Sequence, residues 1–346
     1  MTEERGRTYR DAGVDRDRAD AAKARIAELV RSTARGLAAE SFGRFAGVFP
    51  APGGREPLLV ASADGVGTKL KVAVLAGRHD TVGRDLVNHC VNDVLCAGAR
   101  PLFFLDYIGA GVLDPGVVEQ VVAGLADACR ENDCVLLGGE TAEMPGLYPE
   151  REYDLVGFLV GVGERDRWLH PDRVRVGDVL VALPSSGLHT NGYSLARAIV
   201  FGTLGLRPDD PFPESGRSVA DVLLEVHRSY YRLLSPELEA GTLHGLAHIT
   251  GGGIPGNLPR ALPPDVDAVV RRDSWEVPSV FRVLQRAGQV SEEEMFRTFN
   301  MGVGMILIVE GGREGELLGR LRARGEPGAW VCGHVEPGRG RVRWSG

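Results

Sequence analysis

The sequence lacks the features that define several large classes of protein. Its five cysteines form no Cys-x-x-Cys pair, and an odd number in a chain of 346 residues indicates neither a disulfide framework nor a zinc knuckle. No apolar run approaches the roughly 18 residues that a membrane-spanning helix requires. Residues 1–10 are polar and contain no apolar signal-peptide segment. We therefore expect a cytoplasmic protein with buried, reduced thiols and no membrane partner.

An excess of positive charge is also missing. The 40 lysines and arginines are outnumbered by 47 aspartates and glutamates, giving a net charge of −7, so nucleic acid is not expected as a partner. No internal repeat has the spacing of solenoids or propellers. Hydrophobic residues make up 43% and charged residues 25% of the chain, as in ordinary globular proteins. The length predicts about two domains, at roughly 150 residues each.

Strands and helices are both predicted. Apolar runs of strand length occupy residues 57–63, 101–108, 134–137, 154–162, 178–183, 305–309 and 330–335. Helical patterns cover residues 20–31, 81–98, 117–130, 193–201, 219–234 and 280–287, and Ser291 with Glu294 has the spacing of a capping box. This mixture predicts an α+β or α/β chain. A polar stretch containing Pro171 predicts a boundary between domains of residues 1–170 and 171–346.

A glycine-containing loop follows the first predicted strand. Its sequence, ADGVGTK over residues 63–69, places Asp64, Thr68 and Lys69 around two glycines. Such a loop can approach phosphates closely, with the ammonium of Lys69 supplying positive charge and the carboxylate of Asp64 holding a divalent ion. The spacing of a P-loop is absent, and an ordinary glycine turn with a surface lysine fits the same residues.

The clearest helix, residues 81–98, carries polar side chains beside an apolar stripe. The stripe consists of Val87, Cys90, Val91, Val94 and Leu95, and the side chains off it are Asp85, Asn88, His89 and Asn92. Asp93 falls at the edge of the stripe, where a carboxylate is usually solvated. The alternative is a Mg²⁺ site shared with Asp64, because Mg²⁺ is typically bound by one or two carboxylates and substrate phosphates.

Three further loops contain residues that suit catalysis or phosphate binding. GGETAEMP (138–145) ends a predicted strand and presents Glu140. In PSSGLHTNGYS (184–194), His189 can act as a general acid or base, and amides near Asn191 can bind phosphate. HITGGGIPGN (248–257) fits a dinucleotide-binding loop poorly, but its three glycines beside His248 indicate close approach to a ligand phosphate. A simple turn remains the alternative for the loop 138–145, and a histidine that only caps the loop remains the alternative for 184–194.

These motifs belong to a longer set that occurs in one order along almost the whole chain. The stretches are YRDAGVD (9–15), SADGVGTKL (62–70), RHDTVGRDLVNHCVNDVL (78–95), PLFFLDY (101–107), GGETAEMPG (138–146), SSGLHTNGYSL (185–195), HITGGGIPGNLPR (248–260) and EMFRTFNMGVGM (294–305). As a set they resemble the phosphoribosylformylglycinamidine cyclo-ligase family of purine-pathway enzymes. The resemblance implies an ATP-dependent cyclo-ligase that converts formylglycinamidine ribonucleotide to aminoimidazole ribonucleotide, with release of ADP and phosphate.

The resemblance also implies an architecture. An N-terminal α+β domain would contribute strands to a barrel at the interface of a homodimer, and a C-terminal α/β domain would complete a cleft for ATP and substrate. The ATP-binding positions that it implies are Asp64, Gly65, Gly67, Thr68, Lys69, Glu140, Asn191, Gly251, Gly252 and Gly253. The implied Mg²⁺ ligands are Asp64 and Asp93, and the implied catalytic residues are Lys69, His189 and His248.

The chain departs from the family pattern at two lysines. Many members carry a TGKL segment after the aspartate-tyrosine pair, where this chain has GAGVL over residues 109–113. In the N-terminal helix a lysine often follows Arg-Ile, whereas here Ala27 does, with Lys23 one turn earlier. Two alternatives therefore stay open: a sister enzyme such as a thiamine-phosphate kinase or selenophosphate synthetase, and a nucleotide-binding protein without turnover.

Overall fold

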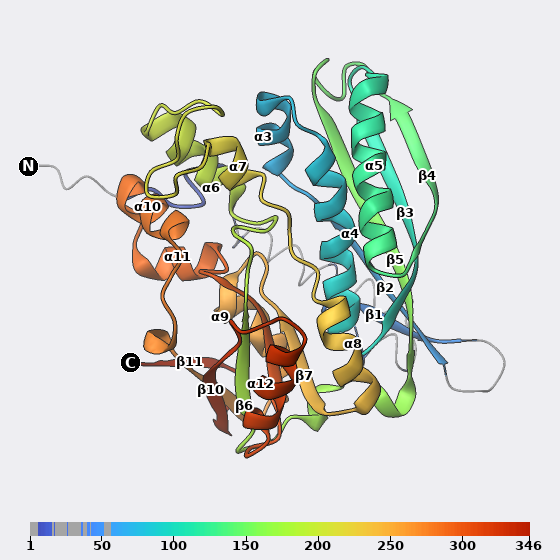
Figure 1. Cartoon of the computed structure of the whole chain (residues 1–346), viewed down its shortest axis with the longest axis vertical. Helices are drawn as coiled ribbons and strands as arrows, with labels where there is room; N and C mark the ends of the chain where they lie inside the picture. Colours follow the sequence, from blue (N-terminus) through green and yellow to red (C-terminus); the bar gives the residue numbers. More distant parts are fainter. Residues whose placement is uncertain are drawn as a thin grey trace, which may run out of the picture.

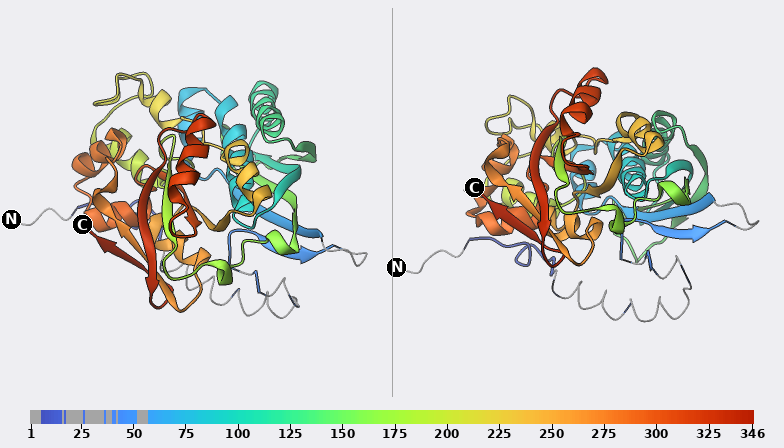
Figure 2. Two further views of the ribbon diagram at one scale, coloured as in Figure 1. Left: turned by 60° about the horizontal axis from the view of Figure 1, so that its bottom comes forward. Right: turned by 90° about the horizontal axis from the view of Figure 1, so that it is seen from below.

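The computed structural model of the chain describes residues 6–15, 17, 26, 36, 40–41, 43–51 and 57–346. Two β-sheets lie side by side, and helix α4 (Asp80–Leu95) runs between them (Figure 1). Two further views show the same separation of the two halves (Figure 2). The helix predicted over residues 20–31 lies outside the described residues apart from Ile26, and so does Lys23.

The first sheet is built from the N-terminal half of the chain. Its strands are β1 (Gly47–Pro50), β2 (Pro57–Gly65), β3 (Arg100–Ala110), β4 (Val135–Glu143) and β5 (Tyr153–Glu164), in the order β1-β2-β5-β3-β4. All neighbours are antiparallel except β3 and β4. One face is covered by α4 and by α5 (Pro115–Glu131), which begins where the Asp114 carboxylate accepts the N–H groups of Gly116 and Val117.

Strand β5 shows how the two faces of this sheet differ. Its side chains alternate between the helix-covered face, where Leu155 and Leu159 are buried, and the outer face, where Val156 and Phe158 are exposed. At Gly157 a Cβ atom would lie 2.3 Å from the ring of Phe104, so only glycine fits beneath the helices. The helix-covered face therefore forms the core, and the outer face remains apolar but open.

The second sheet is built from the C-terminal half. Its strands are β6 (Val179–Pro184), β7 (Leu243–His248), β8 (Val266–Arg271), β9 (Val303–Val309), β10 (Trp330–Pro337) and β11 (Val342–Ser345), in the order β11-β8-β10-β6-β9-β7. All pairs are antiparallel except β8 and β11. Helices of this half are α6 (Tyr193–Arg197), α7 (Val219–Leu223), α8 (Tyr231–Ala240), α9 (Gly253–Asn257), α10 (Ser279–Gly288), α11 (Glu292–Thr298) and α12 (Glu314–Ala323).

Helix α4 is buried on its polar side as well as on its apolar side. Its apolar stripe packs on β2 and β5, while its opposite side contacts β7 and α8 of the second half. Asp85, Asn88, His89 and Asn92 are at most 3% exposed. A polar face that is buried must find hydrogen-bond partners, and these partners form the site described below.

The seven predicted strands all occur, and most predicted helices match within a few residues. The helix predicted over residues 219–234 is wrong, because α7 ends at Leu223 and α8 begins at Tyr231. Helix α6 continues as a π-helix, Ala198–Thr203. The Ser291 hydroxyl accepts the N–H of Glu294, as a capping box requires, but the Glu294 carboxylate binds the N–H of Tyr9 instead of closing the box.

The two halves are both mixed domains of helices and strands. The first sheet is open in the described part of the chain, so the expected barrel is not seen in one chain. The predicted division after residue 170 falls between the last strand of the first sheet and the first strand of the second, and its exact place stays a prediction. None of the helices that the structure describes has the length and apolar character that crossing a bilayer requires. All five thiols are buried.

Candidate active site

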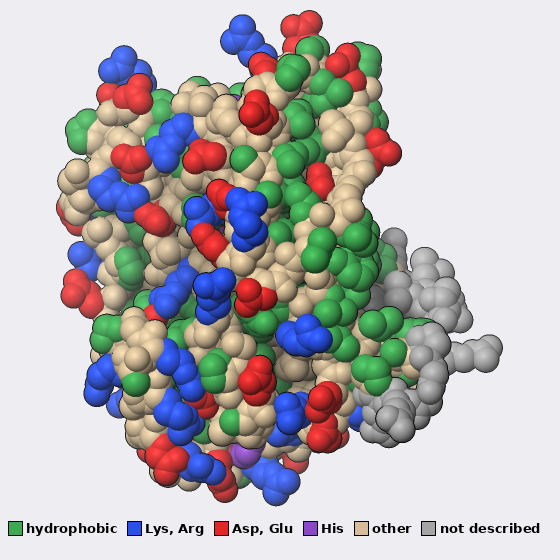
Figure 3. Space-filling view, turned by 45° about the vertical axis from the view of Figure 1, so that its right-hand side comes forward, with side chains coloured by type: hydrophobic (Ala, Val, Ile, Leu, Met, Phe, Trp, Pro, Cys, Tyr) green, Lys and Arg blue, Asp and Glu red, His purple; other side chains and the backbone are tan. Residues whose placement is uncertain are grey.

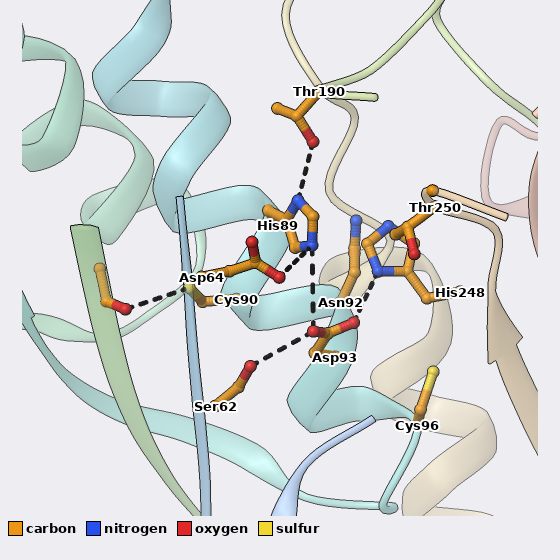
Figure 4. Close-up of polar contacts among 12 residues, drawn as sticks. Ser62, Asp64, His89, Cys90, Asn92, Asp93, Cys96, Thr190, His248 and Thr250 are labelled. Atoms are coloured by element: carbon orange, nitrogen blue, oxygen red, sulfur yellow. Dashed lines mark hydrogen bonds and ion pairs between the residues drawn. The ribbon is translucent and has the colours of Figure 1, made fainter. Parts of the chain in front are cut away.

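Side chains from both halves meet around the middle of α4 (Figure 4). Asp64 lies near the end of β2, His89 and Asp93 lie one turn apart on α4, and His248 ends β7. Thr190 belongs to the loop between β6 and α6. The structure therefore brings the two predicted Mg²⁺ ligands together with one of the predicted catalytic histidines.

The imidazole of His89 lies between the two carboxylates. Its Nε2 is 2.9 Å from Asp64 Oδ2 and 3.9 Å from Asp93 Oδ2, and its Nδ1 is 2.8 Å from the Thr190 hydroxyl. Burial lowers the pKa of His89, but the two carboxylates outweigh burial and raise it to about 9. Burial raises the pKa of Asp64, but His89 and the N–H of Gly65 bring it down to about 2. His89 and Asp64 therefore form an ion pair at neutral pH.

A second histidine contacts Asp93 from the other side. His248 Nδ1 is 2.8 Å from Asp93 Oδ1, and His248 Nε2 is 2.9 Å from Nε2 of His227. The other ring nitrogen of His227 is 3.2 Å from the Thr190 hydroxyl. Burial lowers the pKa of both His227 and His248, so both rings are neutral at pH 7. A continuous hydrogen-bonded path thus runs from Asp64 through three histidines to Asp93.

Sequence reasoning missed His227 because its segment was assigned to a helix. Residues 225–230 instead run beside α4 without regular structure, held by α4 side chains. Asp85 Oδ1 accepts the His227 N–H at 2.6 Å, and Asn88 Nδ2 donates to the His227 carbonyl at 2.7 Å. Asn92 donates to the carbonyl of Arg228 and accepts the N–H of Tyr230. The spacing of these α4 side chains was the signal that a polar segment packs against this face.

Lys69 is fully buried at the start of α3 (Lys69–Ala76). Its Nζ contacts Asp85 at 2.8 Å, the carbonyl of His189 at 3.2 Å and the carbonyl of Glu225 at 2.7 Å. Burial lowers the pKa of Lys69 and raises that of Asp85, while their mutual contact opposes both shifts. The ammonium thus links α3 and α4 to two loops of the second half, and its predicted contact with ATP stays a prediction.

His189 is buried next to His227 rather than open to a ligand. The two rings stack with centroids 4.0 Å apart and an interplanar angle of 19°. Nε2 of His189 accepts the N–H of Ser186 at 3.2 Å, whereas Nδ1 has no hydrogen-bond partner among the described residues. The backbone of His189 is left-handed, with φ 60°. A ring nitrogen without a partner is consistent with the predicted catalytic role of His189, which stays a prediction.

The predicted phosphate-binding loops lie next to one another. Thr68 Oγ1 is 3.0 Å from the Ser194 hydroxyl, which joins the 63–69 loop to the start of α6. A Cβ atom on Gly251 would lie 2.8 Å from Asn191 Oδ1, and one on Gly253 would lie 1.9 Å from a carbonyl oxygen of α11. The structure therefore brings together all predicted ATP-binding residues except Glu140.

Glu140 lies apart from these loops. It is exposed on β4, the edge strand, and pairs with Tyr107 of β3. Strand β2, which carries Asp64, is three strands away, a separation on the order of 14 Å. Within one chain Glu140 does not share a site with Asp64, and its predicted contact with ATP stays a prediction.

A cavity of about 360 Å³ opens beside the carboxylates. Asp64, Asp93 and Thr250 form part of its wall, together with Arg44 and Arg260. The Arg260 guanidinium lies over the Phe45 ring, and its Nη1 bonds Asn257 Oδ1 at 3.1 Å. Arg260 lies in the motif HITGGGIPGNLPR (248–260), whose pattern alone predicts no role for it. Carboxylates and guanidinium groups in one wall suit a cation together with an anionic ligand.

Two groups of side chains in the described residues place three ligand atoms within 4.8 Å of one another. The group His189, His227 and His248 does not fit a metal, since the stacked rings of the first two cannot aim their in-plane lone pairs at one ion. The other group is His89, Asp93 and His248. Asp64 and Asp93 line one cavity, and carboxylate oxygens are the donors that Mg²⁺ prefers. The two aspartates therefore fit Mg²⁺.

The chain has two mixed domains with carboxylates and histidines between them, and it belongs to the class of AIR synthase related proteins. The chain matches the family described as AIR synthase related protein, through its N-terminal domain over residues 44–163 and its C-terminal domain over residues 175–345. Solved structures share the fold: thiamine-monophosphate kinase from Stenotrophomonas maltophilia has a TM-score of 0.64 and 19% identity, covering 93% of this chain and 94% of that one. Hydrogenase maturation protein HypE in complex with ATP has a TM-score of 0.64 and 22% identity, covering 91% and 88%.

The chain belongs to the phosphoribosylformylglycinamidine cyclo-ligase family. It is 48% identical over 331 residues to the phosphoribosylformylglycinamidine cyclo-ligase of Trichlorobacter lovleyi, covering 95% of both chains. It is 50% identical over 348 residues to that of Symbiobacterium thermophilum, covering 98% of both. These two identities confirm the family expected from the motifs. The kinase and the hydrogenase maturation protein, at 19% and 22% identity, share only the fold with this chain.

Proposed function

We infer that the chain converts formylglycinamidine ribonucleotide and ATP into aminoimidazole ribonucleotide, ADP and phosphate. The observation that carries this inference is the identity of 48% to 50% with cyclo-ligases along 95% to 98% of the chain. The site supports it, because Asp64 and Asp93 line one cavity with two arginines, and these groups suit a cation and phosphorylated ligands. The chain is therefore an ATP-dependent ligase of purine biosynthesis.

The chemistry requires activation of an amide oxygen. In the proposed first step the formamide oxygen attacks the γ-phosphorus of ATP, and the bond to ADP breaks. The amidine nitrogen then attacks the formyl carbon, the ring closes, and phosphate leaves with the oxygen that it carries. Phosphoryl transfer asks the protein mainly for alignment and charge neutralisation, and alignment alone can contribute about 7–11 kcal/mol.

The proposed roles follow the geometry of the site. Asp64 and Asp93 would hold Mg²⁺, which would supply neutralisation of the charge on the transferring phosphoryl group. Arg260 faces the anionic groups of a ligand in the cavity. His248 is fixed by Asp93, and Lys69 acts indirectly, since its contacts with three oxygens hold the loops that carry the histidines.

Incubation of the protein with ATP, Mg²⁺ and formylglycinamidine ribonucleotide tests the function directly. We expect stoichiometric aminoimidazole ribonucleotide and phosphate, and the absence of product at micromolar enzyme would overturn the inference. Asp93→Asn is expected to lower kcat/KM by at least 100-fold, because one metal carboxylate contributes several kcal/mol to transition-state stabilisation. If Asp93→Asn binds ATP and turns over like the parent protein, the Mg²⁺ site is wrong and Asp93 is structural.

A homodimer is proposed through the outer face of the first sheet. Phe49, Val135, Leu137, Val156 and Phe158 are each between 40% and 60% exposed on its strands. Figure 3, which brings the side bearing β3, β4 and β5 forward, shows apolar side chains gathered there. An apolar sheet face of this kind is typical of a protein interface. The expected barrel requires that strands of two chains meet at this outer face.

A further inference from the structure

We propose that His227 is a positioning residue for the cyclisation reaction: the N–H at its Nε2 fixes the ring of His248, which in turn aims Asp93 at the cavity. The inference rests on the proposed function for its kinetic consequence, but its structural part can be tested without turnover. No residue role assigned from the sequence includes His227.

His227 does not itself face the ligand cavity. Its side chain is fully buried, and it is absent from the residues that line the cavity beside Asp64 and Asp93. Both ring nitrogens are engaged, one by His248 and one by Thr190. The residue therefore cannot contact a substrate in that cavity and acts through its neighbours.

The main chain of His227 is held as firmly as its ring. Its N–H donates to Asp85 and its carbonyl accepts from Asn88, both side chains of α4. Asp85 is in turn bound by Lys69 at 2.8 Å. Four hydrogen bonds on one residue in a segment without regular structure fix the direction of its Nε2, which is what positioning His248 requires.

The direction of each hydrogen bond can be assigned from the carboxylate end. Asp93 is an acceptor, so His248 carries its hydrogen on Nδ1. The Nε2 atoms of His248 and His227 lie 2.9 Å apart, so one hydrogen lies between them, and we assign it to His227. The Asn92 amide lies 3.2 Å from the same nitrogen and donates one of its two hydrogens to the Arg228 carbonyl at 2.8 Å.

The remaining links agree with this assignment. With its hydrogen on Nε2, His227 accepts at Nδ1 from the Thr190 hydroxyl. Thr190 accepts in turn from Nδ1 of His89, whose Nε2 lies 2.9 Å from Asp64 Oδ2. The contact between Nε2 of His227 and Nε2 of His248 therefore joins the two ends of the path, which carry the predicted Mg²⁺ ligands.

Two substitutions of His227 distinguish the effect of the donor at Nε2 from the effect of removing the ring. In His227→Gln the side-chain amide reaches about as far as Nε2 and can donate to His248, whereas in His227→Asn the amide reaches only as far as Nδ1. We expect His227→Gln to keep kcat/KM within about threefold of the parent protein. We expect His227→Asn to lose about 10- to 100-fold, as outer partners of metal ligands typically do, with the loss in the apparent affinity for ATP and Mg²⁺. His244→Asn is the control, because His244 is a histidine bonded to Asp178. It should change neither kcat/KM nor the apparent affinity for ATP and Mg²⁺.

The readout that does not need turnover is the imidazole ¹⁵N spectrum of His248. In the parent protein we expect a hydrogen on Nδ1 and a hydrogen-bonded acceptor at Nε2; the acceptor signal should persist in His227→Gln and shift in His227→Asn. Absence of that signal in the parent protein overturns the proposal even if a variant does not fold. Equal activity in the two variants, or a loss in both that follows their melting temperatures, also overturns it. If the parent protein has no cyclo-ligase activity but the spectra behave as expected, the function is wrong and the positioning stands.

Discussion

At the scale of single residues, the site is controlled by which groups keep a charge when buried. His89 and Asp64 keep theirs because each is the counter-ion of the other. Burial lowers the pKa of His227 and of His248, and at His248 the contact with Asp93 opposes this shift without reversing it, so both rings are neutral at pH 7. One charged and two neutral imidazoles in one path define the direction of its hydrogen bonds.

The raised pKa of His89 predicts a pH-dependent stability. The folded-state pKa is about 9, against about 6.5 in an unfolded chain. The stabilisation by protonated His89 is therefore complete below about pH 6.5 and is lost as the pH rises through 9. In Mg²⁺-free buffer, we expect His89→Gln to lower the free energy of unfolding at pH 6 by on the order of 3 kcal/mol more than at pH 9.5. Urea unfolding at the two pH values measures this, and Asp64→Asn should remove most of the dependence.

A second prediction at this scale concerns the buried pair of Lys69 and Asp85. Removing one partner of a buried ion pair leaves the other without compensation, which typically costs about 3–5 kcal/mol. Lys69→Met should therefore lower the free energy of unfolding by about that amount, and adding Asp85→Asn should restore part of it. Denaturant unfolding of both chains is the measurement. A Lys69→Met chain that is as stable as the parent but inactive would instead indicate direct contact of Lys69 with ATP.

At the scale of elements, charged side chains also connect helices far from the site. The Glu237 carboxylate of α8 is 1% exposed and bonds Arg320 of α12 at 2.8 Å, Arg324 at 2.7 Å and the Thr242 hydroxyl at 2.6 Å. Burial raises its pKa, but the two arginines and Thr242 bring it down to about 2. The contact ties α8, which borders the site segment 225–230, to the last helix of the chain.

Glu237→Gln tests this contact. Because the folded-state pKa is lowered, the stabilisation is present above about pH 4.5 and is lost as the pH falls through 2. We expect the variant to be less stable by about 2–3 kcal/mol at pH 7 and the difference to shrink between pH 4.5 and 2. Glu316→Gln is the matched control, since its pairs with Arg313 and Arg320 are exposed and should contribute less than about 1 kcal/mol. A pH-independent difference would contradict the assignment.

At the scale of the whole molecule, the outer face of the first sheet predicts the oligomeric state. Each chain has a mass of 37.1 kDa, and light scattering of the parent protein should give twice that value. Phe158→Glu places a charge at the centre of the apolar face and should shift the mass to that of one chain. Val176→Glu alters an apolar residue of the second half that is more exposed than Phe158, and it should leave the dimer intact. A parent protein that is monomeric at micromolar concentration would contradict the proposed interface.

Much of the fold and part of the site could be predicted from local patterns. Strand-length apolar runs located seven strands, and glycines next to Asp64, Asn191 and His248 marked loops that the structure places side by side. These signals are local because a turn or a close backbone approach is decided by the residues at that position. Strands such as β7 and β8 were missed because their sequences alternate too weakly to be distinguished from loops.

The sequence by itself determined the family, the two mixed domains and the loops that carry the predicted ligands, since these depend on residue type and spacing. Only the tertiary structure decided that Lys69 is buried in an ion pair, that Glu140 lies apart from Asp64, and that His227 links the histidines. The physical reason is burial of the polar face of α4. A polar side chain on a helix is equally compatible with water and with a second domain, and only the packing of the second half against α4 excludes the water.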